Sequence, residues 1–158
     1  MTTYKLLRIR EECLFPLYVE HKREIPLGEW IEAGIGDLVD ETHVRSRTGS
    51  KLSLRPGFHS TLVPFTDWIG KKGADGKLYQ RPDTVWCECE VEGQEQTVTD
   101  RNGLRTLPLD WYFFKTNSRQ KEPWVISNRI FIRRILSRNE VEMLCKVHGV
   151  QAQKPAQE

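Results

Sequence analysis

TVWCECEV, the segment Thr84–Val91, is the stretch from which the fold can be predicted most directly. Its second half alternates cysteine or valine with glutamate, so apolar side chains fall at every second position. Successive side chains of a β-strand point to opposite faces, and a period of two is typical of a strand with one buried and one solvated face. We therefore expect a half-buried strand here, with Cys87 and Cys89 sharing one face and the glutamates on the wet one.

Apolar segments on both sides of this stretch predict further strands. They lie at Tyr4–Arg10, Leu14–Val19, Glu29–Ala33, Trp111–Phe114, Trp124–Ile126 and Ile130–Leu136. The polar step Arg10–Glu12 separates the first two and predicts a hairpin. The segments Gly34–Lys51 and Gly70–Pro82 show little periodicity, and their Gly, Asp, Ser and Lys content is typical of surface loops.

The C-terminal part of the chain carries the signal of one helix. Ser137 is followed three residues later by Glu140, which is the spacing of a capping box, and apolar side chains then recur on one face until Gly149. We expect residues 151–158 to form a disordered tail. The predicted architecture is a single α+β domain over residues 1–150, with a mainly antiparallel twisted sheet, whole or split, and a C-terminal helix.

Length and charge limit the classes of protein that fit. A chain of 158 residues has the size of one domain. Its 24 basic and 22 acidic side chains leave a net charge of +2, so the whole molecule exerts no strong pull on nucleic acid or anionic lipid. Its apolar runs are far shorter than the ~20 residues that span a bilayer, and its first residues lack the layout of a signal peptide. We expect a cytoplasmic protein whose four cysteines are reduced thiols.

The densest group of chemically useful side chains is RPGFHST, residues 55–61. Pro and Gly bar a regular strand before Phe58, so ladder pairing should begin there. Around this kink, Arg55 suits a phosphate or carboxylate, and the hydroxyls of Ser60 and Thr61 suit ribose or amide groups, with His59 between them. The segment could therefore bind an anionic, hydroxylated ligand. Alternatively, Phe58 is core, His59 is a hydrogen-bonded interior residue and Arg55 forms a structural ion pair.

Other constellations favour structural interpretations. His59, His148 and the two strand cysteines could be imagined as metal ligands, but their spacing does not match the paired short spacings of zinc sites, so we predict no metal. A Cys-His nucleophile pair is equally disfavoured, because strand cysteines that face a core are usually inert. The basic segment Arg129–Leu136 could contact nucleic acid, but its alternation is more simply that of a strand with one solvated face.

Two resemblances extend this interpretation. The segments Arg55–His59 and Val85–Val91, with Ile25–Ala33 and the first and last strands, resemble a family of small uncharacterised bacteriophage and prophage proteins. In that family the central motif usually reads R-P-G-W-H, and related segments occur at the ends of very large phage polyproteins. The resemblance implies a phage-linked accessory role in the host bacterial cytoplasm and brings no known reaction.

Shorter segments resemble the ADP-ribosyltransferase fold. Arg8 could match the first-strand arginine that holds NAD, and Phe58–Thr61 is similar to the strand that supports the nicotinamide pocket. Gln120 and Glu122 are similar to the acidic pair, in which Gln120 aids transfer and Glu122 is catalytic. This resemblance implies NAD as cofactor, with the Glu122 carboxylate stabilising positive charge on the ribose in a dry pocket. An inactive or repurposed version of the fold is an equal alternative.

Three functions are therefore considered, and they are given in order of preference. The first is a phage-linked protein that binds a host protein or a nucleotide-type small molecule, counteracting host defence, through the surface around Arg55, His59 and Trp68. The second is an NAD-dependent transferase that uses Arg8, Ser60 and Glu122. The third is a minor structural phage protein. Nucleic acid and membrane are not expected as partners, and the sequence leaves the oligomeric state open.

Overall fold

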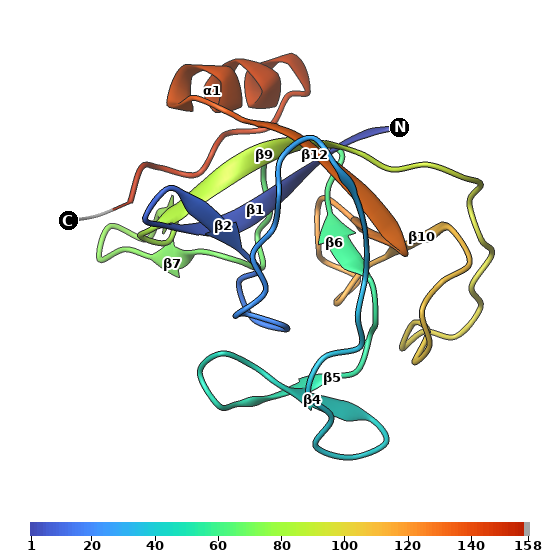
Figure 1. Ribbon diagram of the computed structural model, residues 1–158. Coiled ribbons are helices and arrows are strands. Elements are labelled where there is room, and N and C mark those ends of the chain that lie inside the picture. The colour runs from blue at the N-terminus through green and yellow to red at the C-terminus, as the bar shows by residue number, and fades with distance from the viewer. Residues whose placement is uncertain (157–158) are drawn as a thin grey trace.

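The computed structural model describes residues 1–156 and consists mainly of antiparallel strands, with one helix near the C-terminus (Figure 1). The larger sheet has the order β2-β1-β9-β12-β3. Its strands are β1 (Thr2–Arg10), β2 (Cys13–Phe15), β9 (Thr84–Glu90), β12 (Arg129–Ile135) and β3 (Trp30–Glu32). This confirms the predicted α+β class and the hairpin of the first two strands, which turns at Glu11 and Glu12 with positive φ. The second strand was predicted to run to Val19 but ends at Phe15, because Pro16 has no backbone N–H to donate to the ladder.

A smaller sheet has the order β10-β11-β6, and its strand β6 carries two of the predicted site residues, His59 and Ser60. Its strands are β10 (Trp111–Phe114), β11 (Trp124–Ser127) and β6 (Phe58–Ser60). Pairing in β6 starts at Phe58, as the Pro-Gly step before it predicts. Only Asn128 separates β11 from β12, and Tyr4 exchanges two backbone hydrogen bonds with Thr61, so the chain joins the two sheets twice.

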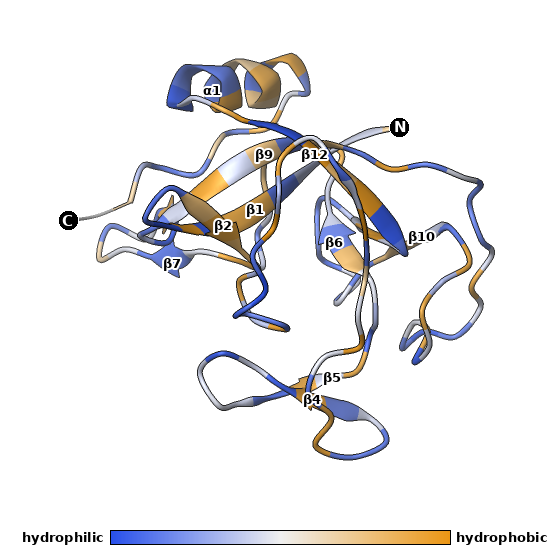
Figure 2. Cartoon of the chain, viewed as in Figure 1, coloured by the Kyte–Doolittle hydropathy of each residue, from blue (hydrophilic) through white to orange (hydrophobic). Residues whose placement is uncertain are grey.

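The two sheets enclose the main core. The inner face of β1 and β9 supplies Leu7, Cys87 and Cys89, and all three are fully buried. They belong to one apolar cluster with Phe58 and Val125 of the smaller sheet. The expected face of strand 84–91 is confirmed, because both cysteines lie inside. Figure 2 shows the same division, with apolar residues concentrated along the central strands and polar residues on the outer loops.

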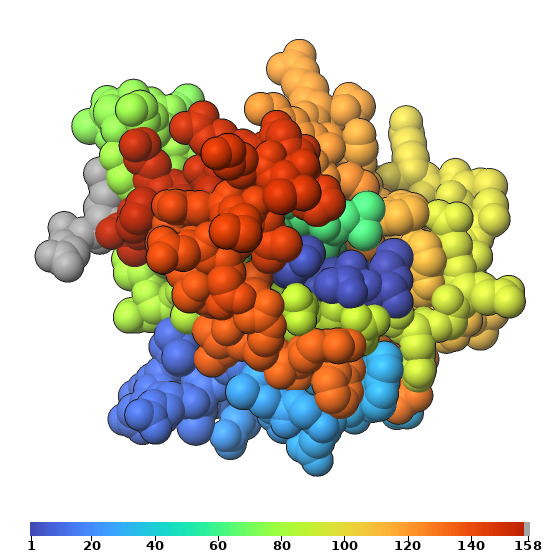
Figure 3. Space-filling view, turned by 90° about the horizontal axis from the view of Figure 1, so that it is seen from above, coloured from blue at the N-terminus to red at the C-terminus, as the bar shows by residue number. Residues whose placement is uncertain are grey.

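The helix α1 (Arg138–Val147) covers part of the outer face of the larger sheet, as Figures 1 and 3 show. Ser137 accepts from the backbone of Glu140 while the Glu140 side chain accepts from the Ser137 backbone, so the predicted capping box is present. Val141 and Cys145 of α1 join an apolar cluster with Trp86 of β9. In the described part of the chain, no helix is long and apolar enough to cross a membrane.

The two segments predicted as loops contain short hairpins. β4 (His43–Arg45) pairs with β5 (Lys51–Ser53), and β7 (Lys71–Lys72) pairs with β8 (Leu78–Tyr79). Strands of two or three residues hold at most one or two apolar side chains, so no period of two can be detected in them. The loop predictions were therefore wrong at β4, β7 and β8, whereas β5 overlaps the predicted loop only at Lys51.

The tail also departs from the prediction over its described part. The Gln153 side chain is buried and donates to the backbone oxygens of Thr66 and Ile69, at 2.8 and 2.6 Å. The backbone N–H of Lys154 donates to the oxygen of Leu78. Polar composition predicts disorder only when the polar groups stay in water, and here internal acceptors hold them. Residues 157–158 of the predicted tail lie outside the described part.

The basic segment of β12 lies opposite the acidic face of β9. Arg133 forms an ion pair with Glu90 at 3.0 Å, and Arg134 pairs with Glu88 and with Glu140 of α1. Arginine charge on β12 is thus compensated by neighbouring carboxylates, which agrees with a strand that has one solvated face. This pairing leaves little free charge there to attract a phosphate backbone.

Candidate functional site

Arg55 lies over an aromatic ring and has no acidic partner. The guanidinium carbon is 4.6 Å from the centre of the Phe114 ring, and Nε donates to the backbone oxygen of Asn102 at 3.1 Å. Within residues 1–156 it forms no ion pair, and its terminal nitrogens make no hydrogen bond. Burial lowers the pKa of this guanidinium. A cation fixed in orientation, with its terminal donors unused, can bind an anion.

His59 contacts Trp124, which belongs to the same apolar cluster of the smaller sheet as Phe114, the ring under Arg55. Its ring lies edge-on to Trp124 with 5.6 Å between ring centres, and its Nδ1 is 3.3 Å from the backbone oxygen of Gly57. Burial, together with the positive charges of Lys5 and Arg55, lowers the His59 pKa to about 3. The imidazole is therefore neutral at physiological pH, and its Nε2 makes no hydrogen bond with the described residues.

Residues far apart in the sequence build this surface, which we call the Arg55 face and define as Arg55, His59, Phe114 and Trp124. The two aromatic residues are nearly buried and belong to an apolar cluster on the outer side of β10 and β11. The loop that carries Asn102 closes over the cluster, because the Leu104 N–H donates to the Tyr112 hydroxyl at 3.2 Å. The structure thus brings together Arg55 and His59, and it adds two rings that the sequence analysis did not assign to the site.

The hydroxyls of Ser60 and Thr61 are not part of the Arg55 face. Both residues are fully buried. The Ser60 hydroxyl donates to the backbone oxygen of Val125 at 3.4 Å, and the Thr61 hydroxyl donates to that of Val63 at 2.6 Å. Side chains alternate along a strand, so Ser60 points to the opposite side of the sheet from His59. These hydroxyls stabilise the backbone of the core.

Gln120 and Glu122 belong to the loop before β11. The Gln120 side chain is almost completely buried, accepts from the Thr116 N–H at 2.8 Å and donates to the Glu122 backbone oxygen at 2.7 Å. It therefore holds the loop closed. The Glu122 side chain is half-buried. Trp68 is 45% exposed and follows Asp67, whose carboxylate accepts from the Lys121 N–H, so Trp68 lies beside this second loop.

Arg8 lies on the half of β1 that is remote from β6. It stands opposite Thr84 and Phe15, and one terminal nitrogen donates to the His21 backbone oxygen at 2.8 Å. β1 pairs with Thr61, the residue after β6, at Tyr4, four residues before Arg8, which corresponds to about 13 Å along a strand. Arg8 and Ser60 are thus separated, although the transferase resemblance would bring them together around one ligand.

The considered metal ligands also lie apart. Cys87 and Cys89 face the core, His59 lies on the outer side of β6 and His148 ends α1. Residues 1–156 contain no group of three or more His, Cys, Asp or Glu side chains placed to hold a metal. Burial raises the pKa of the Cys87 thiol to about 12, which makes it a poor nucleophile.

Lys5 is a chemically important residue that the sequence analysis missed. It stands opposite Cys87 on the inner face of β1, and its ammonium donates to the His59 backbone oxygen at 2.8 Å. It forms no ion pair with a carboxylate of the described chain, and burial lowers its pKa to about 8. The sequence does indicate this position. Side chains two residues apart in a strand share a face, so Lys5 lies on the same inner face as the apolar Leu7.

Replacing Lys5 with methionine should stabilise the protein at neutral pH. The folded-state pKa lies below the unfolded value, so burial of the ammonium destabilises the fold below pH 8, and this penalty fades between about pH 8 and 10.5. After subtraction of the lost hydrogen bond, we expect Lys5→Met to raise the free energy of unfolding by roughly 2 kcal/mol at pH 7. Urea unfolding at pH 7 and pH 10 measures this gain.

The gain should shrink at pH 10, and Lys77→Met at an exposed position should show neither effect. The buried thiols of Cys87 and Cys89 are present in the wild type and in both variants. Comparing each variant with the wild type at the same pH therefore cancels their contribution to the free energy of unfolding. A less stable Lys5→Met protein at pH 7 would show that the ammonium is a net stabilising group.

Comparisons of the chain with protein-family models, with curated proteins and with solved structures found no match. The resemblances to phage proteins and to ADP-ribosyltransferases therefore remain predictions. Function has to be inferred from the geometry of the Arg55 face.

Proposed function

We propose that this chain is a phage- or prophage-linked accessory protein that acts by binding, and that the Arg55 face contacts an anionic group of a host component or a nucleotide-type ligand. The unpaired Arg55 guanidinium stacked on Phe114 supports this proposal most directly. The phage link rests on the resemblance of the Arg55–His59 and Val85–Val91 segments.

The arrangement suits recognition of a phosphate or carboxylate. Guanidinium donors match the two oxygens of such a group, and hydrogen bonds between charged groups are the stronger ones. Stacking on Phe114 and the bond to Asn102 hold the side chain in place before binding, which reduces the entropy lost on association. The neutral His59 adds a hydrogen-bonding nitrogen beside the guanidinium.

The geometry favours binding over transfer of ADP-ribose. The Ser60 hydroxyl and the Gln120 amide are committed to backbone groups. Arg8 contacts His21 and lies remote from Ser60 along β1. The transferase would need these side chains to turn toward one ligand, so NAD is best treated as one ligand to be tested.

A thermal-shift screen against NAD, ADP-ribose and cyclic nucleotides tests the proposal. A ligand at a hundred times its dissociation constant adds about 2.7 kcal/mol of stability. We expect a rise in Tm that disappears in Arg55→Ala and persists in Arg81→Ala, where an exposed arginine of another loop is removed. Consumption of NAD that is lost in Glu122→Ala would instead favour the transferase.

If none of these ligands raises Tm, the host component is sought directly. Immobilised wild-type protein and the Arg55→Ala variant are exposed to bacterial host lysate. A protein retained by the wild type and lost from the variant supports the Arg55 face as the contact surface. Equal retention by both proteins contradicts it.

A further inference from the structure

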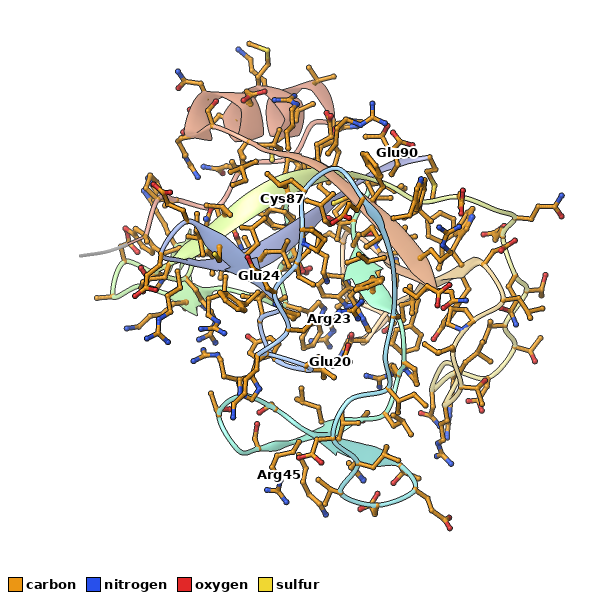
Figure 4. The ribbon with its side chains drawn as sticks, in the orientation of Figure 1. Glu20, Arg23, Glu24, Arg45, Cys87 and Glu90 are labelled. Carbon is orange, nitrogen blue, oxygen red and sulfur yellow. The ribbon has the colours of Figure 1, made fainter. Side chains whose placement is uncertain are left out.

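A second candidate site lies away from the Arg55 face, in a cavity of about 600 Å³. Two loop segments and one end of a hairpin strand line it: residues 20–23, residues 35–37, and Arg45 with Ser46. We call this the basic cavity. Figure 4 shows Glu20 and Arg23 in the space between the larger sheet and the β4–β5 hairpin, which carries Arg45. Its volume falls within the usual range for small-molecule sites.

Positive charge exceeds negative charge in this cavity. Arg23 pairs with Glu20 at 3.3 Å, so these two lining charges compensate each other. Lys22 and Arg45 form no ion pair within the described chain, and they outnumber the remaining carboxylate, that of Asp37. Arg8 does not line the cavity, but it lies behind it: its guanidinium stacks on Phe15 and donates to the His21 backbone oxygen.

The turn that lines the basic cavity also offers backbone donors. Glu20 has a φ of +53°, and the Arg23 N–H donates back to the Glu20 oxygen at 2.9 Å. No hydrogen bond within residues 1–156 uses the backbone N–H groups of His21 and Lys22, which lie inside this turn. Unused N–H groups next to cationic side chains are a recurrent way of holding phosphate oxygens.

We infer that the basic cavity binds a phosphate monoester of a small organic molecule, in the size class of a mononucleotide. A phosphate monoester carries close to two negative charges at pH 7, and the unpaired Lys22 and Arg45 outnumber Asp37 on the lining, so the cavity has the charge sign that such a group requires. A phosphate alone would occupy a small part of this volume. Ile35 is an apolar residue that is 43% exposed, and it can contact the organic part of the phosphate monoester.

Isothermal titration with adenosine 5′-monophosphate at low ionic strength tests this site. We expect binding that Lys22→Gln and Arg45→Gln each weaken by about tenfold, the effect of losing one charge-assisted contact. Both side chains are exposed, so neither change should disturb folding. Arg81→Gln removes a surface arginine elsewhere and should leave the affinity within about twofold. Ribose 5-phosphate should bind, and adenosine should not.

Other outcomes overturn the inference. They are the absence of binding at millimolar concentration, equal binding of adenosine, or affinity unchanged in both cavity variants. The Arg55→Ala variant separates this site from the proposed function, because it should bind adenosine 5′-monophosphate like the wild type. Loss of binding in Arg55→Ala, with retention in the cavity variants, would place the phosphate on the Arg55 face.

Discussion

The Gly57→Ala variant should lose about 3 kcal/mol of unfolding free energy, from backbone strain and overpacking together. Gly57 has a φ of +133°, which side-chain-bearing residues rarely adopt. A β-carbon there would lie 2.5 Å from Cγ2 of Ile126 and 3.1 Å from the backbone oxygen of Ser127. Both atoms belong to β11, the strand that pairs with β6, so neither can move without disturbing the smaller sheet.

Gly49→Ala provides the matched control. Gly49 also has a positive φ, of +85°, but a β-carbon there would meet nothing within 4 Å. Replacing it with alanine should lower the free energy of unfolding by only about 1 kcal/mol, the cost of holding a side-chain-bearing residue at a positive φ. Urea unfolding monitored by tryptophan fluorescence compares the two variants. Equal losses would mean that close packing against β11 does not explain why glycine stands in the motif.

Acid should destabilise the protein through His59. The folded-state pKa of about 3 lies below the ordinary value for histidine. Between these two values, His59 is protonated in the unfolded chain and neutral in the folded protein. The stability that depends on a neutral imidazole is complete above pH 6.5 and is lost as the pH falls towards 3. At pH 4.5 the expected loss from this residue is roughly 3 kcal/mol.

Comparison with His59→Gln isolates this effect, because glutamine does not titrate. The difference in unfolding free energy between wild type and variant should change by that amount between pH 7 and pH 4.5. His148→Gln replaces an exposed histidine at the end of α1 and should follow the wild type. If the difference between wild type and His59→Gln is independent of pH, His59 does not stay neutral in the folded protein.

Local patterns predicted the parts of the fold that local physics determines. The alternation in Thr84–Val91 indicated its buried cysteines, and the spacing of Ser137 and Glu140 indicated the start of the helix. The β4–β5 hairpin was missed, because its strands have three residues each and are too short to show a period of two. Gln153 was assigned to a disordered tail, because its acceptors at Thr66 and Ile69 lie more than eighty residues away.

The candidate site was also predicted only where its residues are close together in the sequence. Arg55 and His59 were found because one short segment carries both. Their aromatic neighbours Phe114 and Trp124 come from strands that only the folded sheet brings alongside. Conversely, the hydroxyl of Ser60 looked available in the sequence, and its orientation into the core depends on the register of β6 against β11.

β1 lies between β2 and β9 in the larger sheet, and its pairing with β9 joins segments far apart in the sequence. Its partner β9 ends about ninety residues later, and β12, which completes the central part of the sheet, ends at Ile135. Until β9 pairs with it, the edge of β1 on that side has no partner, and only the local hairpin with β2 can form. We expect folding to be slow for a domain of this size, as contacts of long sequence separation require.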